Sequence, residues 1–211
     1  MSSSQHVLVT GAGGDIGSAI VQHFVSTGAT VTAVDIKSES EILNRYSKEQ
    51  QSSIKPVCLD LCDQKAVSAL INSGAPLDCV IGNAGVGGTA AFVDIDPSFW
   101  QNTLDVNLTA NFILGQVAAK HFIKNKTPGR IVFTGSWVGS VPWPEITAYT
   151  VSKAGLEMLA KQMARELGVH GIRVNVVAPG IVKAGMAGEL LKTDPVYAKR
   201  AGKVVPLGEF Q

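Results

Sequence analysis

The stretch Thr10-Gly11-Ala12-Gly13-Gly14-Asp15-Ile16-Gly17 follows a short apolar run, His6–Thr10, and leads directly into a helical pattern, Ile16–Thr27. A strand, a glycine-rich turn and a helix in this order are typical of a dinucleotide-binding α/β fold. Glycines let backbone N–H groups approach a pyrophosphate, and the positive end of the helix dipole favours its negative charge. Many strand-to-helix turns need glycine only for a positive φ, so the turn alone does not establish a cofactor site.

Short apolar runs and longer helical patterns alternate along the whole chain. Six strands are predicted, at His6–Thr10, Thr30–Asp35, Ile54–Leu59, Asp78–Gly82, Arg130–Gly135 and Ile172–Ala178. Helices are predicted at Ile16–Thr27, Gln64–Asn72, Ser98–Lys124 and Ala148–Leu167, with a polar and partly helical connection at Ser38–Ser53. This alternation specifies a parallel sheet with helices on both faces. We therefore predict an α/β fold, a Rossmann-like doubly wound parallel sheet in three α/β/α layers, formed by a single NAD(P)-binding domain over residues 1–211.

Composition excludes several classes of protein. The 211 residues are 45% hydrophobic and 17% charged with a net charge of +1, and no basic stripe suggests a nucleic-acid partner. We expect no signal peptide and no membrane span, since no apolar run approaches about 18 residues, and hence a cytoplasmic location. An odd number of cysteines, Cys58, Cys62 and Cys79, favours free thiols. Cys58 and Cys62 lack further ligands of suitable spacing, so no metal site is predicted.

Asp35 closes the second predicted strand, about 20 residues beyond the glycine turn. A carboxylate there can accept hydrogen bonds from both ribose hydroxyls and repel a 2′-phosphate. This position favours NAD over NADP. The alternative interpretation is that Asp35 only ends the strand and caps the following segment.

A second group of residues suggests acid/base chemistry. Tyr149 and Lys153 lie four residues apart at the start of a predicted helix, so they share one face, although such pairs also occur on solvated helices. Ser136 directly follows the fifth predicted strand, at the carboxyl edge of the sheet, where parallel α/β folds bind ligands. With Asn107 these residues form a candidate catalytic set of four.

Further motifs follow in a specific order: Gly82-Asn83-Ala84-Gly85, Asn107, Ser136, Tyr149-Thr150-Val151-Ser152-Lys153 and Pro179-Gly180. In this order and spacing, over nearly its whole length, the chain resembles the short-chain dehydrogenase/reductase family. The resemblance implies an oxidoreductase that moves a hydride between a CH–OH group and NAD or NADP.

The resemblance also implies a role for each member of the set. Tyr149 would be the general base or acid, and Ser136 would hold the same substrate oxygen. Lys153 would bind the nicotinamide ribose and, together with the oxidised nicotinamide, favour the phenolate. Lowering a phenol pKa from about 10 by about 3 units requires about 4 kcal/mol. Asn107 would hold a helix bend and a water that links Lys153 to solvent.

Cofactor contacts implied by the resemblance lie along the carboxyl edge. Asp60 would contact adenine, and Asn83 would either shape the cofactor groove or stabilise the sheet. Ile181 and Val182 would offer backbone contacts to the carboxamide. The predicted cofactor set is Gly11, Gly13, Asp15, Ile16, Asp35, Asp60, Leu61, Asn83, Ala84, Gly85, Tyr149, Lys153, Pro179, Gly180 and Val182.

The chain departs from the family pattern at a few positions. Asp15 replaces the middle glycine of the turn, where it would either lie near the pyrophosphate or N-cap the helix and point away. Gly82 replaces a commoner asparagine, and Ala184 stands where a threonine often holds the carboxamide. Family members usually continue past Gln211 into another helix and a seventh strand, so the sequence is either a fragment or lacks that part of the domain.

The resemblance implies that the segments after Ser136, before Tyr149 and after Pro179-Gly180 form the substrate pocket. The residues that these segments offer are Ser136, Trp137, Val138, Trp143, Glu145 and Met186. The two tryptophans would form an apolar wall, or would instead only pack their loop onto the domain. Glu145 would hydrogen-bond a polyol. We therefore predict an NAD-dependent dehydrogenase of a secondary alcohol, with sugars, polyols or cyclic alcohols as its small-molecule substrates.

Two other functions stay open. One is an NADPH-dependent reductase of carbonyls or 3-oxoacyl thioesters, and the other is a non-catalytic NAD-binding module. By resemblance, the helices at 98–124 and 148–167 would pair across a two-fold axis, so a homodimer or homotetramer is expected.

Overall fold

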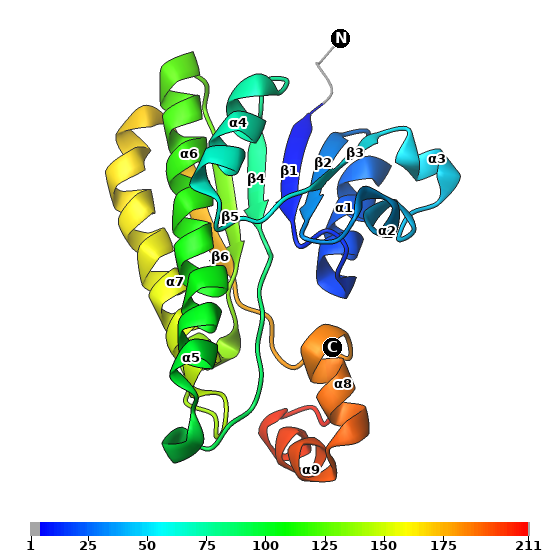
Figure 1. The fold of residues 1–211 in the computed structure, drawn as a ribbon, viewed down its shortest axis with the longest axis vertical. Helices are drawn as coiled ribbons and strands as arrows, with labels where there is room; N and C mark the ends of the chain where they lie inside the picture. The colour runs from blue at the N-terminus through cyan, green and yellow to red at the C-terminus, as the bar shows by residue number, and fades with distance from the viewer. Residues whose placement is uncertain (1–4, 211) are drawn as a thin grey trace.

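The computed structural model describes residues 5–210, which form a six-stranded, fully parallel sheet (Figure 1). The strands are β1 (His6–Thr10), β2 (Thr30–Asp35), β3 (Ile54–Cys58), β4 (Cys79–Gly82), β5 (Arg130–Thr134) and β6 (Arg173–Val177). Their order across the sheet is β3-β2-β1-β4-β5-β6. The order reverses between β1 and β4, so the ligand-binding crevice of a doubly wound fold is expected beyond the carboxyl ends of these two strands.

Helices cover both faces of the sheet, as Figure 1 shows. One face carries α1 (Asp15–Ser26), α2 (Glu39–Leu43) and α3 (Lys48–Gln51), and the other carries α4 (Gln64–Ser73), α6 (Ala110–Asn125) and α7 (Thr147–Leu167). Short 3₁₀ turns lie at Phe92–Asp94, Trp137–Gly139 and Gly168–His170. The prediction of a Rossmann-like α/β/α domain is confirmed.

Two apolar cores separate along the strands because successive side chains of a strand point to opposite faces. Val7 and Val9 of β1 pack with Val21 of α1 on one face. Leu8 lies between them in sequence and packs on the other face, in the same cluster as Leu114 of α6. The continuous β-branched runs of the sequence therefore reflect strands that are buried on both sides.

The predicted helix at Ser98–Lys124 is wrong as a single element. The structure has α5 (Pro97–Leu104), a π-helical segment (Asp105–Thr109) and then α6. The Asn107 amide lies in this segment and binds both backbone groups of Val86, accepting from its N–H at 2.7 Å and donating to its C=O at 2.8 Å. A π turn accommodates one residue more than an α turn, and apolar periodicity alone did not reveal it.

Beyond β6 the chain forms two helices that the sequence analysis did not predict, α8 (Gly185–Thr193) and α9 (Pro195–Val204). They lie past the carboxyl edge of the sheet (Figure 1). Asp194 caps α9 by accepting from the N–H groups of Val196 and Tyr197 at 2.9 and 3.0 Å, and Pro195 starts the helix. The Asp-Pro pair is a helix-start signal that the sequence contained. Within residues 5–210, no helix is long and apolar enough to cross a membrane.

Candidate active site

The glycine turn lies against the loop that follows β4. Gly11 has φ +65°, and a Cβ built on it would lie 2.9 Å from Ala84 Cα. A Cβ at Gly17 would collide with the Gly11 carbonyl, so both positions require glycine for close approach. Gly14 is the N-cap of α1 and provides no side-chain cap for the first N–H groups of the helix. The turn and uncapped helix start together fit an anionic pyrophosphate.

Asp15 does not N-cap α1, so that alternative is wrong. It is the first residue of the helix, and its Oδ1 accepts a 2.6 Å hydrogen bond from Arg45 Nη2. Its Oδ2 accepts from the backbone N–H of Gly185 at 2.8 Å. These interactions, chiefly the one with Gly185, lower the pKa of Asp15, so the carboxylate stays charged beside the predicted pyrophosphate site.

Asp35 faces the same turn from the end of β2. Its carboxylate accepts from the N–H of Gly13 at 2.9 Å and from the N–H of Lys37 at 3.1 Å. The Lys37 amine donates to the Gly13 carbonyl at 3.0 Å. Asp35 thus caps the segment after β2, as the alternative interpretation expects, and it also holds the glycine turn.

Asn83 connects the carboxyl ends of three strands. Its Nδ2 donates to the Thr10 carbonyl at 3.1 Å, and its Oδ1 accepts from the Thr134 hydroxyl at 3.1 Å. The Thr10 hydroxyl accepts from the N–H groups of Asn83 and Ala84 at 2.9 and 3.1 Å. These contacts favour the sheet-stabilising interpretation of Asn83 over direct contact with a ligand.

Tyr149, Ser136 and Lys153 converge beside this network, with Ser136 7% and Lys153 3% exposed. The Lys153 Nζ donates to the Thr134 carbonyl at 2.7 Å and lies 5.5 Å from the centre of the Tyr149 ring. Burial raises the pKa of Tyr149, a hydrogen bond with Ser136 opposes this rise, and negative charge on Tyr197 adds to it. Burial also lowers the pKa of Lys153 to about 8. The structure therefore gathers a half-buried phenol, a buried hydroxyl and a buried amine of lowered pKa.

Asn107 completes the predicted set from the π-helical segment. Its Nδ2 also donates to the Ser152 hydroxyl at 3.0 Å, and that hydroxyl donates to the Tyr149 carbonyl at 2.7 Å. A Cβ at Gly85 would lie 3.2 Å from Asn107 Oδ1 and 3.6 Å from Lys153 Nζ. Asn107 thus fixes the bend between α5 and α6 and positions the first turn of α7.

Gly82, one of the departures, has a packing reason. A Cβ there would collide with Asn111 Oδ1 and lie 2.5 Å from the Phe133 ring. Asn111 is 1% exposed, and its Oδ1 has no hydrogen-bond partner within the described chain. Its amide therefore occupies the space that an asparagine at position 82 would fill.

The predicted substrate residues do not all reach the same place. The rings of Trp137 and Trp143 pack edge to face with centroids 5.3 Å apart. A Cβ at Gly87 would lie 3.0 Å from the Met186 sulfur and 3.3 Å from the Tyr149 ring, so both side chains lie against the same glycine. Val138 is buried, at 3% exposed, in the short 3₁₀ turn that follows Ser136.

Two residues of α9 that the sequence analysis missed extend this wall. The Tyr197 ring lies 6.1 Å from that of Trp143, and the Arg200 guanidinium lies 5.7 Å from the Trp143 centroid. Arg200 also pairs with Glu145, with Nη1 and Oε2 3.4 Å apart. The Asp-Pro start of α9 was the available signal, but its docking against Trp143 depends on tertiary contacts.

The remaining predicted cofactor residues follow their strands at the same edge. Asp60 Oδ1 accepts from the N–H of Cys62 at 2.9 Å within the turn before α4. The Pro179 carbonyl accepts from the N–H of Trp137 at 3.1 Å, which ties the segment after β6 to the segment after β5. Ala184 N-caps α8 without a side-chain bond. Ile16, Leu61, Gly180 and Val182 lie on these same turns and helix starts.

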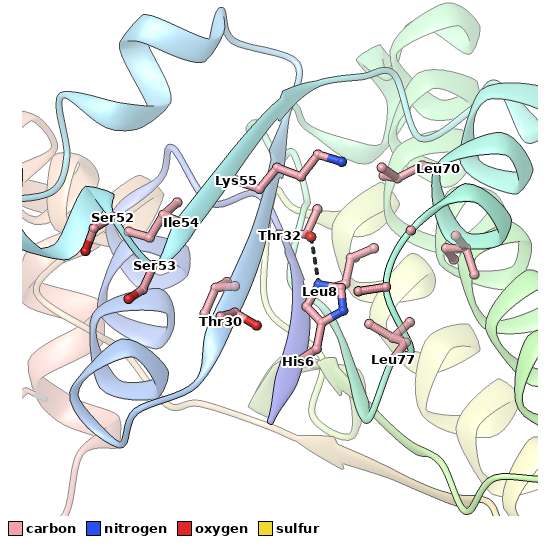
Figure 2. Close-up of a pocket in the computed structure, with 14 residues that line it drawn as sticks. His6, Leu8, Thr30, Thr32, Ser52, Ser53, Ile54, Lys55, Leu70 and Leu77 are labelled. Carbon is pink, nitrogen blue, oxygen red and sulfur yellow. Dashed lines mark hydrogen bonds between the residues drawn. The ribbon is translucent and has the colours of Figure 1, made fainter. Parts of the chain in front are cut away.

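A separate cavity of about 330 Å³ lies at the opposite edge, around the amino ends of β1, β2 and β3 (Figure 2). Its lining includes His6, whose Nε2 lies 2.9 Å from Thr32 Oγ1, and the Lys55 side chain. No residue of the predicted sites lines it. The candidate chemistry is thus confined to the carboxyl edge.

Comparison with known proteins agrees with this geometry. Residues 5–195 match the short chain dehydrogenase family model. L-xylulose reductase from Homo sapiens is 36% identical over 209 residues, covering 99% of this chain and 84% of that protein. Carbonyl reductase [NADPH] 2 from Sus scrofa is 34% identical over 208 residues, with the same coverage of 99% and 84%.

A solved structure described as a candidate NAD(P)-dependent gluconate 5-dehydrogenase from Beutenbergia cavernae superposes with a TM-score of 0.89. The two sequences are 26% identical, and the match covers 99% of this chain and 84% of that one. The chain therefore belongs to the short-chain dehydrogenase/reductase family and is an oxidoreductase of alcohol or carbonyl groups that uses NAD or NADP.

Proposed function

We propose that this protein is an NAD-dependent dehydrogenase of secondary alcohols, with polyols and sugars as its substrates and Tyr149 as the general base. The observation that carries the proposal is the convergence of half-buried Tyr149 with buried Ser136 and Lys153 at the carboxyl edge. The bound dinucleotide would supply the hydride acceptor.

Tyr149 would take the proton of the substrate hydroxyl as the hydride leaves the carbon. Ser136 would donate a hydrogen bond to the same oxygen and strengthen it as negative charge develops. Burial works against the phenolate, because it raises the pKa of Tyr149. Positive charge at Lys153, 5.5 Å from the ring centre, opposes that cost and so links the protonation states of the two groups.

Two observations support the substrate class and the cofactor. The relatives include L-xylulose reductase from Homo sapiens and D-erythrulose reductase from Gallus gallus, at 36% and 34% identity, both named for hydroxylated carbonyl compounds. Asp35 presents a carboxylate at the ribose position, which favours NAD. A relative named for NADPH and the nearby Lys37 amine favour NADP instead, so the preference has to be measured.

The test is absorbance at 340 nm with NAD and then NADP, over matched polyols, sugars and cyclic alcohols and over their ketones with the reduced cofactors. Turnover with NAD that falls by several orders of magnitude in Tyr149→Phe supports the proposal. Thr150→Val, which alters the next residue of the helix, serves as the control. Full turnover in Tyr149→Phe would remove the phenol from the mechanism. NADPH-dependent ketone reduction alone would favour the carbonyl reductase, and cofactor binding without any turnover would favour the non-catalytic module.

We also propose that the protein assembles as a homodimer through α6 and α7. Both helices carry exposed apolar side chains, including Phe112 (45%), Val151 (42%) and Met158 (61%). Burying such groups against a second copy would remove them from water. Sedimentation at micromolar concentration should show a dimer that Met158→Lys weakens, and a monomer in the unaltered protein would refute the proposal.

A further inference from the structure

Helix α9 carries a basic face that the proposed reaction does not use. Val196, Lys199, Arg200 and Lys203 recur at the spacing of one helical face. With Pro195 they line a shallow groove of about 510 Å³ that includes three cations and no carboxylate. Within residues 5–210, neither Lys199 nor Lys203 takes part in an ion pair. The groove therefore has positive charge that its own lining does not neutralise.

Arg200 connects this groove to the reaction centre. Its guanidinium packs on Trp143, which in turn packs on Trp137, the residue after Ser136. Tyr197 of the same helix touches Trp143 and lies close enough to Tyr149 to influence its charge. Arg200 is therefore linked to the Ser136 and Tyr149 region through a continuous row of aromatic rings, Trp143 and Trp137.

The present partner of Arg200 leaves it largely free to bind. Nη1 and Glu145 Oε2 are 3.4 Å apart, at the long limit of a hydrogen bond, and the Glu145 side chain is 55% exposed. A guanidinium has five N–H donors, so most remain available to another acceptor. Glu145 also has a left-handed backbone, φ 68°, held by a 2.8 Å bond from the Ala90 N–H to its carbonyl. Such backbone strain recurs in ligand-binding segments.

We propose that Arg200, assisted by Lys199 and Lys203, binds an anionic group, a carboxylate or a phosphate, on a hydroxylated substrate whose reacting carbon lies at Tyr149. This inference rests on the proposed function and narrows its substrates to sugar acids or sugar phosphates. Arg200 is then a specificity-determining residue, because a guanidinium binds two oxygens of a carboxylate or a phosphate through paired hydrogen bonds. Glu145 holds Arg200 in place and competes with the substrate anion.

The test uses three ligands of one carbon skeleton: glucitol, gluconate and glucitol 6-phosphate. Binding to the full chain with NADH present is followed by tryptophan fluorescence, which Trp137 and Trp143 report without any turnover. We expect at least one anion to bind about tenfold or more tightly than glucitol, and to weaken as salt rises. The tighter of the two anions identifies the chemical group.

Matched variants locate the effect. Arg200→Met keeps the side-chain stem on Trp143 and should abolish the preference for the anion, while glucitol binding changes little. The double variant Lys199→Gln with Lys203→Gln should weaken the preference for the anion over glucitol less than Arg200→Met does. Glu145→Gln should strengthen this preference. Lys124 is an exposed cation at the end of α6, and Lys124→Met should leave the binding of all three ligands unchanged. Equal binding of glucitol and both anions, no response to either anion, or an unchanged preference in Arg200→Met would each overturn the inference. Failure of the proposed function would be separate: no turnover of any alcohol or ketone at 340 nm.

Discussion

Asp15 and Gly185 are joined by a 2.8 Å hydrogen bond, in which the carboxylate at the start of α1 accepts the backbone N–H at the start of α8. The bond links the glycine turn to the segment that follows β6, across the crevice where a dinucleotide would bind. Arg45 holds the same carboxylate from the other side at 2.6 Å. The departure from glycine at position 15 therefore connects the glycine turn to the start of α8.

Asp15→Asn should bind NADH more tightly, by about threefold to tenfold, because it removes a negative charge near the pyrophosphate. Nicotinamide fluorescence titration measures the change. Asp96→Asn, which alters an exposed helix cap at the start of α5, outside the predicted cofactor set, is the control. Weaker binding in Asp15→Asn would mean that the contact with Gly185 preorganises the site more than its charge opposes the phosphates.

Asp35→Ala should shift the ratio of kcat/KM values toward NADP over NAD by about tenfold or more, since the carboxylate no longer repels a 2′-phosphate. The Lys37 amine, which lies 3.0 Å from the Gly13 carbonyl, would then be the nearest charged group to that phosphate. Steady-state rates with both cofactors measure the ratio. Adding Lys37→Met should reverse part of the gain, and an unchanged ratio in Asp35→Ala would refute this account of the carboxylate.

Lys153 should make stability depend on pH. Burial lowers its pKa from 10.5 to about 8 in the folded protein, so the charged amine destabilises the fold at neutral pH. As pH rises from about 8 to about 10.5 the folded state releases this proton first, and stability increases. Relative to Lys153→Met, the wild-type free energy of unfolding should rise by up to about 3 kcal/mol across this window. Urea unfolding at several pH values measures it, and parallel curves for the two proteins would contradict the prediction.

Positions 82 and 111 should be energetically coupled. Gly82→Ala should lower the free energy of unfolding by about 1–3 kcal/mol, because its Cβ meets Asn111 and Phe133. Asn111→Ala removes one of these obstacles. In the double variant the loss should be smaller than the sum of the single losses by about 1 kcal/mol. Urea unfolding of the four proteins forms the cycle, and strict additivity would show that Phe133 alone excludes the added carbon.

The sequence was sufficient to predict the six strands and the meeting of Ser136, Tyr149 and Lys153, because short-range patterns determine both. Each strand is a β-branched run, and each of these side chains follows a strand or begins a helix. The carboxyl ends of parallel strands meet at one edge, so their neighbours in sequence become neighbours in space.

The interactions of Asp15 and Arg200 could not be predicted in the same way. Asp15 bonds to a residue 170 positions away, and Arg200 packs on a tryptophan that belongs to a loop after β5. Neither contact follows from the spacing of apolar residues along the chain, and both depend on where α8 and α9 pack.

The π-helical segment at Asp105–Thr109 stores one residue more than an α-helix of the same rise. Deleting one residue there would allow α5 and α6 to merge, rotating α5 by about 100° around the common axis. Thr103, now fully buried, would swing away from the interior, and the Asn107 amide would lose its alignment with Val86. The position of the Asn107 amide therefore depends on the number of residues between α5 and α6 as much as on its hydrogen bonds. Removing one residue would disconnect α5 from the active site without altering any residue that performs the reaction.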